Sequence, residues 1–275
     1  MTRTRTLQGG WYPDSAHGVR RQCESWEAGL GPAVRRFRSV VVPHAGWVFS
    51  GRIAYETLRR LQPDLETIVV VGGHLRPDDP LHLAPEDRYE TPLGELEADD
   101  ELADLLSSTF AAVPDRRPDN TVEVQLPLVH YLYPGARALY LRCPPSETAL
   151  ATGRAVAEFA ARSGRRIGVV GSTDLTHYGP AYDFAPRGLG EEAVRWVRRE
   201  NDRAIVDAML ALDAETTIRR ALDDRSACSS GAAAASITYA LRTGCEASEL
   251  VEYGQSYDVR PDASFVGYAG IGFYS

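Results

Sequence analysis

Short apolar runs alternate with amphipathic stretches along most of the chain. The apolar runs predict strands, which lie at 38–42, 67–73, 136–142 and 166–172. Stretches whose apolar residues recur with helical spacing predict helices, which lie at 51–61, 99–107 and 147–162. This alternation is typical of β–α units that form a mostly parallel sheet.

The remaining segments fit the same architecture. Residues 88–96 predict a hairpin, and 119–135 predict a helix in which Asn120 and Glu123 form a capping box. Two or more helices are expected within 190–243, followed by two strand-like runs around a turn at 260–262. We find no internal repeat and no linker. The sequence therefore predicts one α/β domain over residues 1–275, with a mostly parallel central sheet flanked by helices.

Composition and charge narrow the class of protein. A chain of 275 residues can bury a sizeable core. Its net charge of -8 argues against nucleic-acid binding, which needs clustered Lys and Arg. No apolar stretch approaches the roughly 18 residues that span a bilayer, and the N-terminus lacks the apolar segment of a signal peptide. We therefore expect a cytoplasmic protein that binds neither nucleic acid nor membrane.

Titratable side chains follow three of the predicted strands. His44 follows strand 38–42, His74 follows strand 67–73, and both Asp174 and His177 follow strand 166–172. Ligands bind beyond the carboxyl ends of strands in parallel sheets, so these groups are expected at one edge. Each group alone also fits a structural role in a turn or a cap. Their coincidence at one edge favours a metal or catalytic site.

Two histidines from different strands call for a third metal ligand. The four cysteines are widely spaced and form no CxxC pair, so a functional cysteine is expected to act singly as a thiolate. Asp174 and Cys143 are candidates because each follows a strand. Cys228 is another, because a helix is expected to begin near it and a helix N-terminus favours the thiolate. Spacing alone does not choose between the two cysteines.

Six segments, in order along the chain, carry a family resemblance. They are GGWYP (9–13), PHAGWVFSG (43–51), VVVGGH (69–74), DNTVEVQLP (119–127), STDLTHYG (172–179) and YGQSYD with SFVGYAGIGF (253–258 and 264–273). With them the chain resembles the Memo family, which in prokaryotes includes AmmeMemoRadiSam system protein B, over almost its whole length. The fold of that family is similar to the class III extradiol dioxygenases, which are non-haem iron enzymes.

The resemblance implies a set of roles for individual residues. Metal ligands of the family match His44, His74 and Cys228, while Asp174 and His177 match residues that line the same cavity. Two positions differ from the family pattern. Asn120 stands where the family has a histidine, and Ser229 with Ser230 follows Cys228 where the family usually has glycine. The second histidine motif, which ends at His74, is also shorter than in many relatives.

The leading functional hypothesis is a non-haem iron(II) oxidoreductase of the extradiol dioxygenase type. Its substrates would be O2 and a small catecholic or other aromatic molecule. His177 would move a substrate hydroxyl proton, because an imidazole titrates near neutral pH. Asp174 would orient His177 or a water on the metal. The predicted pocket residues are Trp47, Asn120, Tyr178, Tyr12 and Arg76.

Two other classes of function stay open at this point. A thiolate ligand also suits copper or zinc, and zinc would make hydrolysis the natural chemistry. A non-catalytic protein could use the same cavity to handle metal or to bind a partner through a phosphotyrosine-like anion, with Arg76 as the anion contact. The sequence does not define the oligomeric state, and a homo-oligomer is left open.

Overall fold

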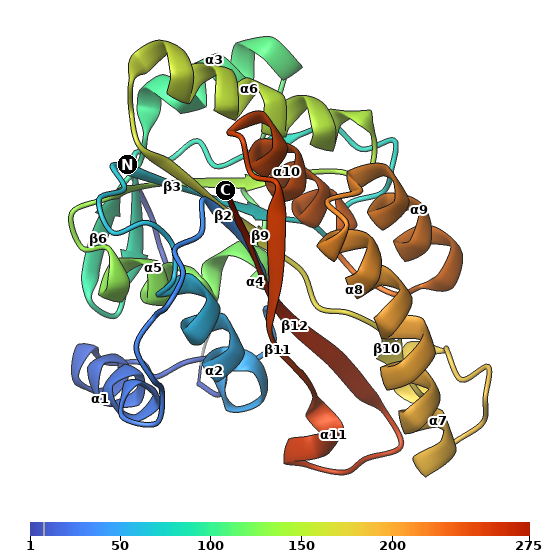
Figure 1. Ribbon diagram of the computed structural model, residues 1–275. Coiled ribbons are helices and arrows are strands. Elements are labelled where there is room, and N and C mark those ends of the chain that lie inside the picture. The colour runs from blue at the N-terminus through green and yellow to red at the C-terminus, as the bar shows by residue number, and fades with distance from the viewer. Residues whose placement is uncertain (8) are drawn as a thin grey trace.

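A mixed β-sheet with helices on both faces forms the centre of the computed structural model, which describes residues 1–7 and 9–275 (Figure 1). The order of the strands in this sheet is β10-β12-β2-β9-β3-β8-β4-β7, and β11 pairs with β12. Their bounds are β2 Ser39–Val42, β3 Thr67–Gly72, β4 His82–Leu83, β7 Val113–Pro114, β8 Arg137–Arg142, β9 Ile167–Ser172, β10 His177–Tyr178, β11 Ala247–Gln255 and β12 Phe265–Tyr274. A smaller sheet contains β1 Thr2–Arg3, β5 Arg88–Thr91 and β6 Gly94–Glu97.

The four strands β2, β9, β3 and β8 are parallel neighbours, whereas β12 and β11 add antiparallel strands at one side. Successive side chains of a strand point to opposite faces. In β3, Val69 and Val71 pack into one hydrophobic cluster while Ile68 and Val70 pack into another. The apolar runs are continuous because both faces of the parallel strands are buried.

Two groups of helices pack against the two faces of the sheet and complete the two hydrophobic clusters. One face is covered by α3 Asp100–Phe110, α6 Glu147–Ser163, α8 Asp202–Leu210, α9 Ala214–Asp224 and α10 Ser230–Arg242. The opposite face is covered by α1 Ala16–Glu27, α2 Trp47–Leu58, α4 Asn120–Glu123 and α5 Leu126–Leu132. The remaining helical segments are η1 Pro180–Tyr182, α7 Glu191–Trp196, the π-helical η2 Val197–Asn201 and α11 Ser256–Val259. The predicted fold class, an α/β fold with a mostly parallel central sheet, is confirmed.

Local differences from the sequence prediction have identifiable causes. The predicted helix at 51–61 begins earlier, at Trp47, because Gly46 serves as the N-cap of α2. The helix expected at 119–135 is divided into α4 and α5. The predicted capping box is wrong, since the N-cap of α4 is Asp119, whose carboxylate accepts the Thr121 backbone N–H.

The carboxylate of Glu123 has a different role from the one predicted. It accepts the backbone N–H groups of Thr6 and Leu7 and the hydroxyl of Tyr12, at 2.8–3.0 Å. Glu123 is 5% exposed, so these are hydrogen bonds of a buried charge, which are stronger than those between neutral groups. Glu123 therefore fixes the N-terminal segment against α4.

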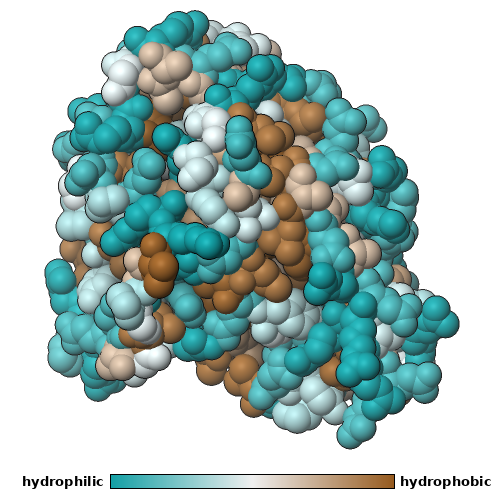
Figure 2. Space-filling model, viewed as in Figure 1, coloured by the Kyte–Doolittle hydropathy of each residue, from teal (hydrophilic) through white to brown (hydrophobic). Residues whose placement is uncertain are grey.

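The visible surface is mainly hydrophilic. Figure 2 shows hydrophobic side chains chiefly along the middle of this face, in the region where β11 lies in Figure 1. Most of β11 is half-buried, and its pairing with β12 is interrupted by an irregularity between Leu250 and Glu252. No helix among the described residues is both long enough and apolar enough to cross a membrane.

Candidate metal centre

Three adjacent parallel strands end at the same edge of the sheet and deliver three polar side chains there. Val42 at the end of β2 pairs with Ser172 at the end of β9, and Gly171 pairs with Val71 of β3. His44, Asp174 and His74 each follow the last residue of their strand by two positions. The topology therefore brings these side chains to one edge.

Cys228 reaches this edge from the segment that leads into α10. Its backbone N–H donates to the Asp174 carbonyl at 3.2 Å, and the next N–H, of Ser229, donates to Thr173 Oγ1 at 3.1 Å. Two glycines allow the close approach of this segment to the strands. A Cβ on Gly73 would lie 2.4 Å from Ser229 Cβ, and one on Gly171 would lie 2.6 Å from the Ala232 carbonyl oxygen.

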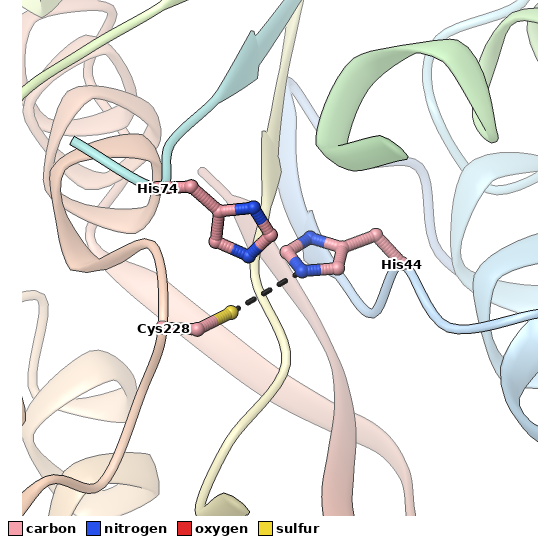
Figure 3. Close-up of side chains that lie close together, drawn as sticks. All are labelled: His44, His74 and Cys228. Atoms are coloured by element: carbon pink, nitrogen blue, oxygen red, sulfur yellow. Dashed lines mark hydrogen bonds between the residues drawn. The ribbon is translucent and has the colours of Figure 1, made fainter. Parts of the chain in front are cut away.

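His44, His74 and Cys228 point toward one another from three separate segments (Figure 3). One donor atom from each lies within 4.8 Å of the others, and His44 Nε2 is 3.2 Å from Cys228 Sγ. Ligands that bind one ion at about 2.0–2.3 Å lie about 3–4.6 Å from each other. Two imidazoles and a thiolate are also a donor set that zinc, copper and iron accept. The residues present therefore fit a single divalent ion.

Hydrogen bonds hold the fully buried His44 in a defined orientation. Its backbone N–H donates to Asp174 Oδ1 at 2.7 Å, and its Nδ1 lies 3.3 Å from Ser172 Oγ. Gln125 Nε2 in turn donates to Ser172 Oγ at 3.1 Å and to the Pro43 carbonyl at 2.7 Å. Partners on Nδ1 leave Nε2 as the nitrogen that faces Cys228, which is the usual arrangement behind a metal-binding histidine.

His74 is held by a carboxylate and by an uncommon backbone conformation. Its φ of 58° lies in the left-handed region, which few residues other than glycine adopt. Its Nδ1 lies 3.4 Å from Asp119 Oδ2, and Arg142 in turn donates to Asp119 at 3.2 Å. Buried Arg142 also pairs with Asp115. This chain of charges orients the half-exposed ring of His74, so that Nε2 is free to bind.

The electrostatics of the cluster favour a thiolate. Burial alone would raise the pKa of the Cys228 thiol, but the charge of His44 and hydrogen bonds from His44 and His74 hold it well below its usual value. Burial alone would lower the histidine pKa values. Instead, Cys228 and Asp174 raise the pKa of His44 to about 9. Asp119 and Cys228 raise the pKa of His74 to about 10. Without metal, the cluster is thus a thiolate beside imidazolium, and an incoming cation replaces the protons.

His177 lies in β10 and lines the cavity beside the cluster. Its Nδ1 lies 3.1 Å from the Leu175 carbonyl, which can only accept, so Nδ1 carries the proton and Nε2 remains as an acceptor. The ring of Tyr182 meets the imidazole edge-on, with centroids 4.8 Å apart. In the part of the chain that the structure describes, no hydrogen bond joins Asp174 to His177, although both line the cavity. The hydrogen bond of the Asp174 carboxylate is to the backbone N–H of His44.

The cavity has a volume of about 500 Å³ and is lined by His44, His74, Asp174 and His177 together with other polar and aromatic side chains. Of the predicted pocket residues, Asn120 lines it, and its Nδ2 donates to the His44 carbonyl at 3.2 Å. Tyr12 and Trp47 line a neighbouring pocket with Trp26. The Trp47 ring packs against the rings of Tyr12 and Trp26, and none of these three is among the described residues that line the cavity beside the cluster.

The predicted roles of Tyr178 and Arg76 are not met by the structure. Tyr178 is fully buried, stacks on Phe265 and donates its hydroxyl proton to the Gly188 carbonyl. Arg76 is exposed in a turn, where its N–H donates to Asp79, and it is not among the described residues of the cavity wall. Sequence inspection missed the wall residues Phe49, Tyr182 and Tyr268, and no spacing signal marks them.

Gly73→Ala is expected to weaken metal binding. The added methyl would lie 2.4 Å from Ser229 Cβ and 2.8 Å from Ser229 Cα, so the Cys228–Ser229 segment must move away from His74. Overpacking of this kind costs about 1–3 kcal/mol, and a displaced thiolate would lower the affinity for zinc in a competition titration. The matched control is Gly135→Ala, because a Cβ there meets nothing within 4 Å. Equal zinc affinity of the two variants would show that the cluster tolerates this movement.

A buried polar network supports the strand that carries His177. Asp202 at the start of α8 is fully buried, and its Oδ1 accepts the Thr176 N–H at 3.0 Å. Tyr253 donates to its Oδ2 at 2.7 Å, and the Asn201 side chain donates to Thr176 Oγ1 at 2.9 Å. Burial raises the pKa of Asp202 to about 6, although these hydrogen bonds act to lower it. The π-helical turn η2 precedes Asp202 directly, and such turns occur often at functional sites.

Removal of the Asp202 carboxylate is expected to destabilise the protein. In Asp202→Ala, the Thr176 N–H and the Tyr253 hydroxyl lose their acceptor, at a cost of about 1–3 kcal/mol for each group left unsatisfied. Urea denaturation measures this as a lower free energy of unfolding. Asp207→Ala on the same helix is the control, because Asp207 only forms an exposed pair with Arg203. Equal stability of both variants would contradict the assigned role of Asp202.

Comparisons with known proteins show which sequences the chain is similar to. The profile of the family described as "Memo-like protein" matches residues 3–272. A MEMO1 family protein of Methanococcoides burtonii is 33% identical over 273 residues, covering 97% of each chain. A MEMO1 family protein of Thermococcus onnurineus is 31% identical over 292 residues, covering 99% of each chain. A third, from Archaeoglobus fulgidus, is 34% identical over 242 residues, covering 85% of each.

The match extends over almost the whole chain, so it includes every segment that contributes to the cluster. None of these names states a reaction or a metal, and the likeness to extradiol dioxygenases stays a prediction. The family assignment made from the six motifs is confirmed: this chain belongs to the Memo-like protein family.

Proposed function

We propose that the protein is a metal-dependent oxidoreductase that uses O2 and acts on a small aromatic substrate with adjacent hydroxyl groups. The observation that carries the proposal is the convergence of His44, His74 and Cys228 on one point of a cavity that also contains His177. These three residues would hold the ion, with iron(II) as the proposed metal. When bound, iron(II) supplies the electron transfer that lets O2 react with an aromatic ring.

The side chains around the cluster have separate tasks in this proposal. Nε2 of His177 accepts the proton of a substrate hydroxyl, because Nδ1 is occupied by the Leu175 carbonyl. A general base in this position typically contributes about 100- to 10,000-fold to the rate. Asp174 and Ser172 fix His44. Phe49, Tyr182 and Tyr268 provide aromatic walls for a planar ring and exclude water from it.

Zinc-dependent hydrolysis is the rival that the donor set itself favours. Thiolate is a softer ligand than the carboxylate of most oxygen-activating iron sites, and it suits zinc. In that case zinc would lower the pKa of a bound water toward neutrality, and the cavity would admit a hydrolysable substrate. A metal-handling or partner-binding protein without turnover is the third candidate, and it needs only the cluster and the cavity.

One experiment separates these candidates. The metal-free protein is reconstituted anaerobically with iron(II), zinc or copper, and oxygen uptake is followed with a panel of catechols and aminophenols. The proposal expects oxygen consumption with a ring-derived product in the iron form alone. Activity that follows zinc without oxygen consumption would replace the proposal with the hydrolase, and inactivity of all three forms would favour the binding protein.

A further inference from the structure

The cavity beside the donor cluster carries a single guanidinium group. Arg260 is the one Lys or Arg among the described residues that line it. Its side chain is exposed, and its guanidinium carbon lies 5.7 Å from the centre of the Phe49 ring, which is also part of the wall. No described carboxylate lies within 4.0 Å of this guanidinium. The charge is thus held at an aromatic wall and is available to a ligand.

Neighbouring groups add a hydrogen-bond donor and set the charge balance. Ser264 Oγ accepts the Ala181 N–H at 3.0 Å, so its own O–H is directed elsewhere. Asp262 accepts the Ser264 N–H at 3.3 Å and also lines the cavity, as does Asp174. Repulsion from these two carboxylates is smaller for a ligand with one negative charge than for a ligand with two. The balance favours a monovalent anion such as a carboxylate over a dianionic phosphate.

The groups that line the cavity differ in exposure. The donor cluster includes His44, which is 1% exposed, whereas Arg260 lies in the exposed segment after α11. Aromatic residues on the same wall suit a planar ring. A guanidinium binds a carboxylate with two parallel hydrogen bonds, which fixes orientation as well as affinity. A ring whose carboxylate pairs with Arg260 would leave its hydroxyl groups for the cluster.

We propose that Arg260 selects aromatic substrates that carry a carboxylate on the side of the ring away from the donor cluster. This inference rests on the proposed function for the direction of the ring, but the binding of a carboxylate does not depend on turnover. Arg76, which the sequence suggested as the contact for a phosphotyrosine-like anion, is not among the described residues of the cavity wall and serves as the matched control.

The test compares ligands that differ in charge, on the full-length protein, by isothermal titration calorimetry. 3,4-Dihydroxyphenylacetate should bind about 10- to 100-fold more tightly than 4-methylcatechol, because charge-assisted hydrogen bonds contribute at this level. Phenyl phosphate should bind more weakly than phenylacetate. Arg260→Gln should abolish the preference for the carboxylate, Arg260→Lys should retain part of it, and Arg76→Gln should leave it unchanged.

Each outcome has a separate meaning. Equal affinity for the two catechols, or a preference that survives in Arg260→Gln, would overturn the inference. Tighter binding of phenyl phosphate than of phenylacetate would overturn the charge assignment. If the carboxylate preference depends on Arg260 but no oxygen is consumed, the inference stands and the proposed function fails. If neutral and charged catechols are both turned over and bind with equal affinity, the proposed function stands and the inference about Arg260 fails.

Discussion

Replacement of Cys228 by serine is expected to weaken the binding of a divalent metal ion by at least about 100-fold. Loss of a residue that only orients a ligand typically costs 10- to 100-fold, and Cys228 is itself one of the three converging donors. The hydroxyl of serine stays protonated at neutral pH, whereas the low pKa of the Cys228 thiol provides a thiolate. Competition titrations against a chromophoric chelator, with zinc and with anaerobic iron(II), measure the change.

Cys143→Ser is the matched control for this experiment. Cys143 also follows a strand of the sheet, but it is fully buried, lies outside the donor cluster, and burial raises the pKa of its thiol to about 12. Its replacement should leave metal affinity unchanged. If Cys228→Ser bound metal as tightly as the control, the ion would have to be placed on other residues.

His177→Ala is expected to lower the rate of turnover by about 100- to 10,000-fold while the metal content stays the same. The variant loses the ring nitrogen that would accept the hydroxyl proton, but His177 is not part of the donor cluster. The measurement is the kcat of oxygen uptake alongside the metal content of the same samples. His17→Ala, at an exposed position in α1, controls for the loss of an imidazole.

Two results would remove His177 from this role. Full turnover in His177→Ala would mean that another group takes the proton. A parallel loss of metal and turnover would mean that His177 supports the cluster. Absence of turnover in the wild type as well, with unchanged affinity for a partner, would favour the binding protein over the enzyme.

The strand pattern was sufficient to place two of the three donors. Residues 67–73 are continuously apolar because β3 is buried on both faces, and such a run can be recognised without any contact information. The parallel topology then dictates that the residues after β2, β3 and β9 meet at one edge. His44 and His74 were therefore found from spacing alone, and the predicted mostly parallel sheet follows from the same pattern.

Other parts of the site depend on contacts that spacing does not encode. Cys228 follows a helical region, and only the family resemblance distinguished it from Cys143. The position of Arg260 on the cavity wall could not be read from spacing either, because the segment after α11 joins the cavity through the pairing of β12 with β10 and β2. Tyr178 resembled a wall residue because it follows His177, yet alternate residues of a strand face opposite sides.

His44 and Cys228 are separated by 184 residues, although their side chains meet. At synthesis rates of about 5–20 residues per second, roughly 10–40 s pass between the emergence of the first and the last donor. From the emergence of His74 to that of Cys228, the nascent chain displays both histidines without the thiolate. On the proposal that these residues hold a metal ion, all three donors would be together only after the Cys228 segment and α10 have reached the sheet. Binding then stabilises the completed fold alone, by about 2.7 kcal/mol at a free ion concentration 100 times the Kd.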